Sequence, residues 1–274
     1  MRRRAVMRAV AACLTGLLLL AFAVAPIRMD EREDAVDDSV GVIELGDGYR
    51  ASSRWSWHRP QFKTKMPERM ELDVPLIAQN PELPNGCEAT SLTMLLQYLG
   101  FDADKMDIAY DHMPRGDVIW RDGQAVAPDP ETTYIGNPGD RSGYYILVPG
   151  LIDTAESYLK DQESTLRAAD VSGIDEEGLV ELVARRVPVV VWVTKSYEDV
   201  AYDDDEWSTV LDSETFHPYH NLHCVLIVGY DEDSFLINDP LEDKAQWVPR
   251  DTFMHGFSEL GERAMIVSSA PVID

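Results

Sequence analysis

Towards its C-terminal end the chain reads LHCVLIVGYDEDSFLINDP over residues 222–240, and this passage constrains the structure strongly. Two apolar runs flank an acidic turn, a pattern that predicts a β-hairpin. If the hairpin pivots near Asp231, His223 lies opposite Asp239, with the two Cβ atoms roughly 5 Å apart on one face. Asn238 is the competing partner, because neighbouring strand residues point to opposite faces and a slip of one residue exchanges them.

The elements around this hairpin predict an α+β class with an antiparallel sheet, because helices come first and strands later. A helix is expected from Cys87 to the Gly100 stop signal, where leucines recur at helical spacing. The other expected helices are 151–160 and 175–186, and the expected strands are 72–77, 189–194, 222–229, 234–238, 245–248 and 264–268. Residues 101–150 are expected to be irregular. We assign the folded unit, residues 69–274, to a single domain.

Composition and charge narrow the function classes. The 274 residues are 45% hydrophobic, enough for a sizeable core. The formal net charge is −25, from 24 Lys+Arg against 49 Asp+Glu. Such a surface repels phosphate backbones and anionic headgroups, which argues against a nucleic-acid partner. Three cysteines without a CxxC pair argue against a disulfide scaffold, and no cofactor is expected.

The first segment has the form of an export signal. Four arginines among residues 2–8 precede an apolar run over 9–25, and Ala21-Phe22-Ala23 offers small residues for cleavage. Residues 1–25 are therefore expected to be a signal peptide or an N-terminal membrane anchor, which makes the protein secreted or extracytoplasmic, at a bacterial cell surface. Residues 26–68 are interpreted as an acidic linker or a pro-segment.

Cys87 is the candidate nucleophile. It opens the amphipathic helix, so its sulfur is expected at the positive end of the helix dipole, where the thiolate is favoured and the thiol pKa falls. A structural cysteine would more commonly lie mid-face with the leucines. Taken alone, the position is suggestive only.

A nucleophilic thiol needs a base, and an imidazole needs an orienting partner. His223 and Asp239 supply both if the hairpin forms as predicted. Each residue alone is better explained as a strand end or strand terminator, but together with Cys87 three independent features coincide. Cys224 could bridge Cys87 in an exported protein. However, it adjoins His223 on a strand and is expected to face away, as a buried small hydrophobe.

Gln79 is the candidate for oxyanion stabilisation. It precedes the turn that leads to Cys87, and its amide could donate to the oxyanion together with the Cys87 N–H. A turn amide that caps backbone groups is an equally good explanation.

Metal binding is the weaker interpretation of the remaining histidines and acids. A zinc site from His217, His220 and His223 is disfavoured because three-residue spacing in an extended segment does not bring ligands together. Calcium sites at 203–206 or 231–233 lack the spacing of an EF-hand loop and are better explained as solvated acidic turns. No metal is expected.

An ordered set of motifs gives a family resemblance. The set comprises Gln79, Gly86-Cys87-Glu88-Ala89-Thr90, Gly136-Asn137-Pro138, Pro188 to Thr194, His223 to Asp231, and Asn238-Asp239-Pro240. Together they resemble the stand-alone relatives of bacteriocin-processing (double-glycine) cysteine peptidases, a branch of the papain-like fold. One departure is Arg186-Val187-Pro188, where the family usually has Gly shortly before the Pro. It affects a turn.

The resemblance implies a papain-like domain with Cys87 as nucleophile, His223 as general base and acid, Asp239 as its orienter and Gln79 in the oxyanion hole. The leading hypothesis is an exported cysteine peptidase that hydrolyses peptide bonds of a peptide or protein substrate through an acyl-enzyme. Two alternatives keep the fold: a catalytically inactive surface binding module, and a thiol acyltransferase or transpeptidase. The sequence does not predict the oligomeric state.

Overall fold

The computed structural model describes residues 66–209 and 215–269, all within one compact unit. The predicted signal or anchor at 1–25 lies outside the described residues, as does all but the end of the predicted linker or pro-segment at 26–68. None of the helices described is long and apolar enough to cross a membrane.

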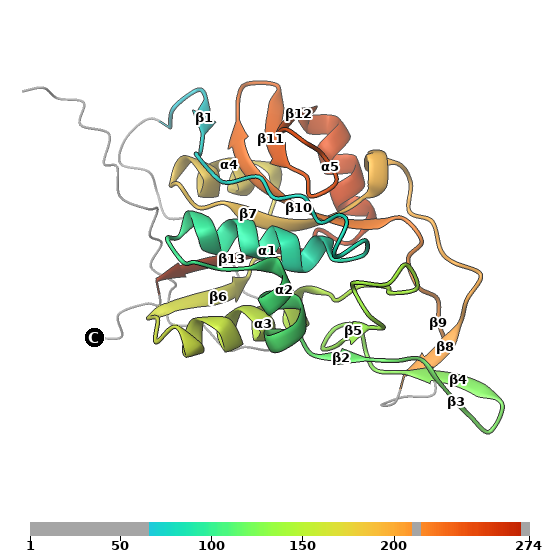
Figure 1. The fold of residues 1–274 in the computed structure, drawn as a ribbon. Coiled ribbons are helices and arrows are strands. Elements are labelled where there is room, and N and C mark those ends of the chain that lie inside the picture. Colours follow the sequence, from blue (N-terminus) through green and yellow to red (C-terminus); the bar gives the residue numbers. More distant parts are fainter. Residues whose placement is uncertain (1–65, 210–214, 270–274) are drawn as a thin grey trace, which may run out of the picture. The chain divides into compact units, whose positions relative to one another are not determined.

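The larger sheet carries the core. In the part of the chain described, it has seven strands in the order β12-β11-β10-β7-β13-β6, with β1 beside β10 (Figure 1). All of its pairings are antiparallel. The strands are β1 (Met70–Glu71), β6 (Leu166–Asp170), β7 (Val189–Thr194), β10 (Leu222–Tyr230), β11 (Ser234–Asn238), β12 (Gln246–Pro249) and β13 (Ala264–Ser269).

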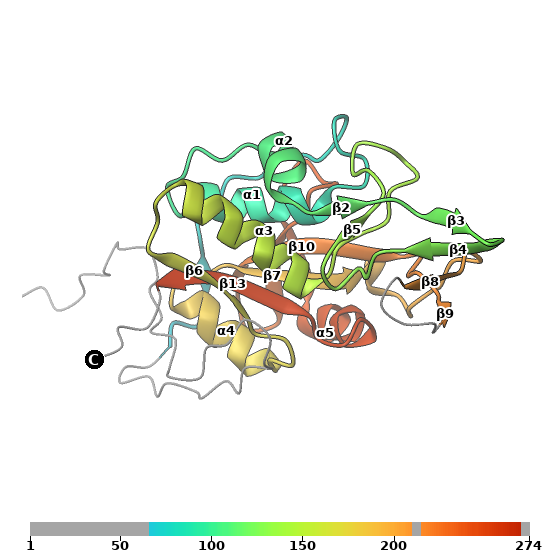
Figure 2. The ribbon, with the colours of Figure 1, turned by 90° about the horizontal axis from the view of Figure 1, so that it is seen from below.

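Helices cover both faces of this sheet (Figure 2). On one face lie α1 (Cys87–Tyr98) and α3 (Val148–Asp161), and on the other α4 (Glu176–Ala184) and α5 (Arg250–Glu259). Because helices cover both faces of the sheet, β7 is buried at every position, which explains its continuous apolar sequence. The predicted α+β class, with the helix that begins at Cys87 packed on an antiparallel sheet, is confirmed.

Helix α1 begins at Cys87 because the preceding turn closes tightly. A Cβ on Gly86 would lie 2.6 Å from the Cβ of Leu83, so only glycine fits there. The apolar side chains of α1 pack into the core beneath β10. Gly100, two residues after the helix, has φ +92°, a conformation that favours glycine and ends the helix as predicted.

The region expected to be irregular, 101–150, contains several short elements. They are α2 (Lys105–Asp107), a π-helical turn η1 (Ile108–His112), β2 (Arg115–Gly116), β3 (Ile119–Arg121), β4 (Gln124–Ala127) and β5 (Tyr134–Ile135). Strands β3 and β4 join β8 (Trp207–Thr209) and β9 (Thr215–Phe216) in a four-stranded sheet, and β2 pairs with β5. A short 3-10 turn, η2 (Lys195–Tyr197), follows β7.

The expected helices and strands need three corrections: one expected strand is wrong, and one strand and one helix were not expected. The strand expected at 72–77 is wrong: the chain pairs with β10 as a strand only at Met70–Glu71, and Pro75 has no N–H to extend the pairing. Strand β6 was not expected because its Leu-Arg-Ala-Ala-Asp sequence lacks β-branched residues. Helix α5 was not expected either, although Phe253 and Phe257 are four residues apart and buried.

Candidate active site

His223 and Asp239 are in contact at the open end of the β10–β11 hairpin. His223 Nε2 lies 2.7 Å from Asp239 Oδ1, and both side chains are largely buried. The register differs from the predicted one, because Leu226 pairs with Asn238 and a bulge interrupts the ladder nearer the turn. Asp239 therefore reaches His223 diagonally. The two registers differ by two residues, which leaves Asp239 on the predicted face.

The competing partner, Asn238, points elsewhere. Its Nδ2 donates to the carbonyl oxygens of Val74 at 3.2 Å and Pro75 at 3.4 Å. This bond ties the segment before α1 to the end of β11. The structure thus separates the two candidates that the sequence left open.

The contact with His223 changes the acidity of Asp239. Burial raises the pKa of this carboxyl, but the hydrogen bond and charge of His223 outweigh it, with help from the Leu241 N–H and Lys195. The net result is a pKa below the usual value. Asp239 is therefore held as the carboxylate, the form that accepts from an imidazole N–H.

Cys87 is buried at the first position of α1, and its sulfur lies at the edge of β10. The nearby Cys224 backbone N–H acts to lower the pKa of this thiol. That N–H belongs to the peptide joining His223 to Cys224, so the fold brings the sulfur to the residue that carries the imidazole. Strand β10 begins at Leu222, four residues before its first pairing with β11 at Leu226.

The prediction that the helix start lowers the Cys87 pKa is wrong. Burial raises this pKa most, and the charge of Glu88 raises it further. The Cys224 N–H and the more distant Lys195 act in the opposite direction without reversing the result. The resting species is the thiol, whose Sγ donates to Glu88 Oε2 at 3.3 Å.

The expected orientation of Cys224 also needs correction. Its side chain packs in the same hydrophobic cluster as Cys87, beneath α1, whereas Val225 belongs to the opposite face. By strand alternation His223 shares the face of Val225. The sulfur therefore approaches the strand edge rather than the His223 face. Both cysteines are free and buried, so Cys224 is the small buried hydrophobe that was predicted.

Gln79 takes the turn-capping role in this structure. It is buried, and its Nε2 donates to the Pro84 carbonyl at 2.8 Å. Its Oε1 has no hydrogen-bond partner. The amide group carries two hydrogens, so one remains beside the turn that leads to Cys87.

Two residues near the thiol were not singled out from the sequence. Glu88 stood in the quoted motif without a role, because an acidic residue in a first helical turn is ordinary. Lys195 follows the buried strand β7, and its charge lowers the pKa values of Cys87, Glu88 and Asp239. A cation directly after a buried strand was the available signal.

A cleft of about 430 Å³ opens beside these residues. Its lining includes Asn85, just before the helix, Lys195, and Leu222, which precedes His223. Asn85 fixes one wall, because its Nδ2 donates to three carbonyls of the 140–143 loop. The cleft also carries charges of both signs, from Arg141, Lys195, Asp203 and Asp205.

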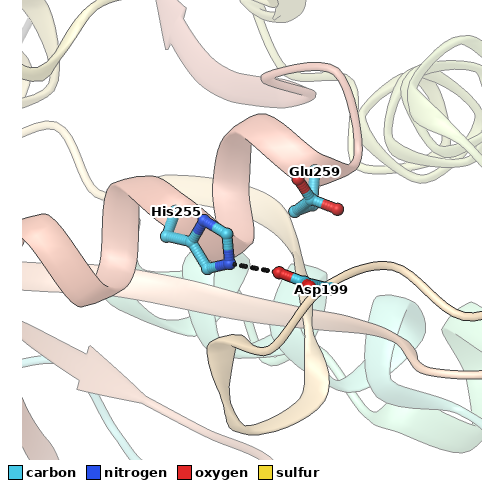
Figure 3. A group of neighbouring side chains, drawn as sticks. All are labelled: Asp199, His255 and Glu259. Carbon is cyan, nitrogen blue, oxygen red and sulfur yellow. Dashed lines mark hydrogen bonds and ion pairs between the residues drawn. The ribbon is translucent and has the colours of Figure 1, made fainter.

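One group of side chains offers metal-ligand atoms, at Asp199, His255 and Glu259 (Figure 3). These atoms lie within 4.8 Å of one another. His255 and Glu259 are four residues apart on α5, a spacing that suits a transition metal. However, His255 Nε2 bonds Asp199 Oδ1 at 2.9 Å and Glu259 accepts from the Val200 N–H at 2.8 Å. All three side chains are thus satisfied without an ion.

The three histidines considered for zinc do not converge. His220 Nδ1 bonds Asp203 at 2.8 Å, and His223 bonds Asp239. In the described part of the chain, His217 joins no group of three ligand side chains. The His223 imidazole is therefore oriented by a carboxylate.

The fold is α+β, and the structure places the Cys87 and His223 side chains in its core, with Asp239 partly buried beside His223. The sequence matches the Peptidase_C39 like family over residues 71–265. The chain belongs to this family. The predicted resemblance to double-glycine peptidases and their stand-alone relatives is thereby confirmed.

Several individual proteins are similar to this chain. A structure from Bacillus anthracis, assigned as a C39-like peptidase, is 32% identical, covers 74% of this chain and 98% of its own, and has a TM-score of 0.64. The uncharacterized protein YvpB of Bacillus subtilis (strain 168) is 27% identical over 198 residues, 72% of this chain and 75% of its own. A double glycine motif protease from an AMS/PCAT transporter is 16% identical over 73% of this chain and 94% of its own, with a TM-score of 0.42.

Proposed function

We propose that this protein is an exported cysteine peptidase that uses Cys87 as nucleophile, His223 as base and acid, and Asp239 as the group that orients His223. The observation that carries the proposal is the partly buried 2.7 Å contact between His223 Nε2 and Asp239, with the Cys87 thiol near the backbone of the next residue, Cys224. Membership of the C39-like family supports a peptidase-type activity. The signal-like sequence pattern predicted for residues 1–25 supports the proposal that the protein acts outside the cytoplasm.

The reaction follows from which atoms are free. Asp239 occupies Nε2 of His223, so Nδ1 is the nitrogen left to take the proton from Cys87. The thiolate attacks a peptide carbonyl, and the Cys87 N–H and the free Gln79 amide hydrogen donate to the oxyanion. His223 passes its proton to the leaving amine as the C–N bond breaks. Water then attacks the thioester with His223 as base, which releases the acid and restores the thiol.

The cleft beside the thiol is the proposed substrate site. Its lining includes Asn85, two residues before Cys87, and Leu222, the residue before His223, which favours this cleft as the place where a peptide approaches the candidate site. The cleft has charges of both signs and the chain carries −25 overall. We expect peptide or protein substrates that are neutral or cationic, with an effect of net charge that weakens beyond about 8 Å in physiological salt.

Substitution of the two cysteines tests the proposal. Cys87→Ala should lower peptide hydrolysis by at least about a thousandfold, because the acyl-enzyme can no longer form. Cys224→Ala is the matched control, a second buried thiol, and should retain turnover. Fluorogenic peptide libraries measure the rates, and thermal melting checks that both variants fold. Hydrolysis that survives in a folded Cys87→Ala protein would remove this residue from the mechanism.

A second function has its own supporting observation. The resting thiol is buried, donates to a carboxylate and has a raised pKa, which is what a binding module with an inactive site would show. The peptidase and the binding module differ in whether His223 increases the reactivity of the Cys87 thiol. If alkylation of Cys87 at pH 6 is equally slow in wild type and His223→Ala, the binding module is the better description.

A further inference from the structure

The carboxyl group of Glu88 is buried against the candidate nucleophile. Glu88 is the second residue of α1 and is completely inaccessible to solvent. Its Oε2 accepts from the Cys87 thiol at 3.3 Å, and its Oε1 accepts from the Ile146 N–H at 3.2 Å. A fully buried glutamate usually has a cation in direct contact. Here the hydrogen-bond donors are a thiol and a backbone amide.

The groups that face Glu88 come from several elements. Besides Cys87, they are Tyr134 of β5, Tyr145, Lys195 of η2 and Cys224 of β10. Burial raises the pKa of both tyrosines, so they remain neutral. Lys195 is exposed, and its attraction for Glu88 is screened by solvent. The negative charge of Glu88 is therefore weakly balanced within the core.

Glu88 and Cys87 titrate as a coupled pair. Burial raises the pKa of Glu88 to about 7, while its hydrogen bonds and Lys195 act against the rise. Ionised Glu88 in turn raises the pKa of Cys87. A thiolate beside a carboxylate is disfavoured by like charge, whereas a neutral carboxylic acid can donate to a thiolate. The two protonation states of Glu88 thus have opposite effects on the sulfur.

We propose that Glu88 is a positioning residue that controls the proton on Cys87: as a carboxylate it holds the sulfur as a thiol, and as a neutral acid it donates a hydrogen bond to the thiolate. The inference rests on the proposed role of Cys87 as nucleophile. It adds a regulation, because hydrolysis is released when Glu88 takes up a proton. The peptidase would then be favoured on the acid side of neutrality.

Alkylation of Cys87 by iodoacetamide tests this without a substrate. The full-length protein is labelled at a series of pH values, and the Cys87 peptide is quantified by mass spectrometry. Because His223 is the proposed base for the thiol, the key profile is that of His223→Ala, in which Glu88 acts without it. Its rate should rise tenfold per pH unit up to about pH 7, where Glu88 ionises, then stay flat before rising again. The double variant Glu88→Gln/His223→Ala should rise through pH 7 without a break.

The single variant gives the second readout. Glu88→Gln should label at least about tenfold faster than wild type at pH 8, the effect of lowering the thiol pKa by one unit. Glu181→Gln is the matched control, since Glu181 is also a buried helical glutamate but lies on α4 and pairs with Arg185. It should follow wild type.

Two results would overturn the proposal: a His223→Ala profile without a break near pH 7, or a folded Glu88→Gln protein that labels more slowly than wild type. If Glu88→Gln does not fold, the His223→Ala profile alone decides. Failure of the proposed function has a different signature, which is hydrolysis retained by Cys87→Ala. Such a result would remove Cys87 from the mechanism, but it would not alter the alkylation profiles on which the role of Glu88 is judged.

Discussion

Two histidine–aspartate pairs from neighbouring parts of the chain have nearly the same geometry and very different surroundings. His223 lies 2.7 Å from Asp239, and His220 lies 2.8 Å from Asp203. The side chains of the first pair are 5% and 21% exposed, and those of the second 66% and 32%. Contact distance alone does not identify the functional pair. Burial is what distinguishes the proposed catalytic pair, because a pair shielded from water interacts more strongly and holds one orientation.

The backbone reinforces this difference. His223 is part of β10, where it pairs with Val193 of β7 in the middle of the sheet. His220 belongs to the approach to that strand, which is held by an isolated bridge between Tyr202 and Tyr219. The His223–Cys224 peptide also meets the Cys87 sulfur. The inner pair, His223–Asp239, is thus fixed relative to the candidate nucleophile, and the outer pair, His220–Asp203, is fixed relative to a loop.

The largest expected effect separates the two histidines. His223→Ala should lower kcat/KM for peptide hydrolysis by about 10²- to 10⁴-fold, the usual contribution of a general acid–base. His220→Ala should change it by no more than about twofold, because an exposed pair contributes little. Steady-state kinetics on one peptide, with circular dichroism to check folding, measures both. Equal losses in the two variants would show that burial does not distinguish the pairs.

The hairpin that carries His223 could be predicted because its signals are local. The expected strands 222–229 and 234–238 match β10 and β11 to within one residue. The register could not be predicted, since a bulge between Ile227 and Gly229 shifts the pairing. The contact between His223 and Asp239 was still expected correctly. The face to which a strand residue points repeats every two residues. Because the predicted register was wrong by two residues, Asp239 stayed on the expected face.

The surroundings of the sulfur could not be read from the sequence. Strand alternation says that His223 and Cys224 face opposite sides, but it does not say which edge of β10 the helix approaches. Packing of α1 over Cys224 decides that. Glu88 has the pattern of an exposed first-turn acid, and its burial depends on Tyr134 and Ile146 from distant parts of the chain. The raised pKa of Cys87 follows from the same packing.

Substitution of Asp239 and Asp203 should separate the two pairs by a smaller effect on kcat/KM. Asp239→Asn should lower kcat/KM by about tenfold, because an amide oxygen still accepts from Nε2–H but a neutral hydrogen bond is weaker than a charge-assisted one by about 1.4 kcal/mol. Asp203→Asn removes one exposed charge from the proposed cleft and should change kcat/KM by no more than about twofold, through KM rather than kcat. The same assay measures both variants. A loss in Asp203→Asn as large as that in Asp239→Asn would contradict the distinction between the pairs.

The smallest effect is on stability in acid. His223 holds the pKa of Asp239 below its usual value despite burial, so the carboxylate stabilises the fold above the unfolded pKa of about 3.9. This contribution disappears as the pH falls from there through the lower folded pKa. Urea unfolding from pH 6 to pH 2 should therefore show wild type losing stability more steeply than Asp239→Asn at the acid end. Asp203→Asn should stay parallel to wild type, since its pair is exposed. If Asp203→Asn instead reduces the loss of stability at low pH, the exposed His220–Asp203 pair is the one that stabilises the fold. Burial would then not predict which pair contributes.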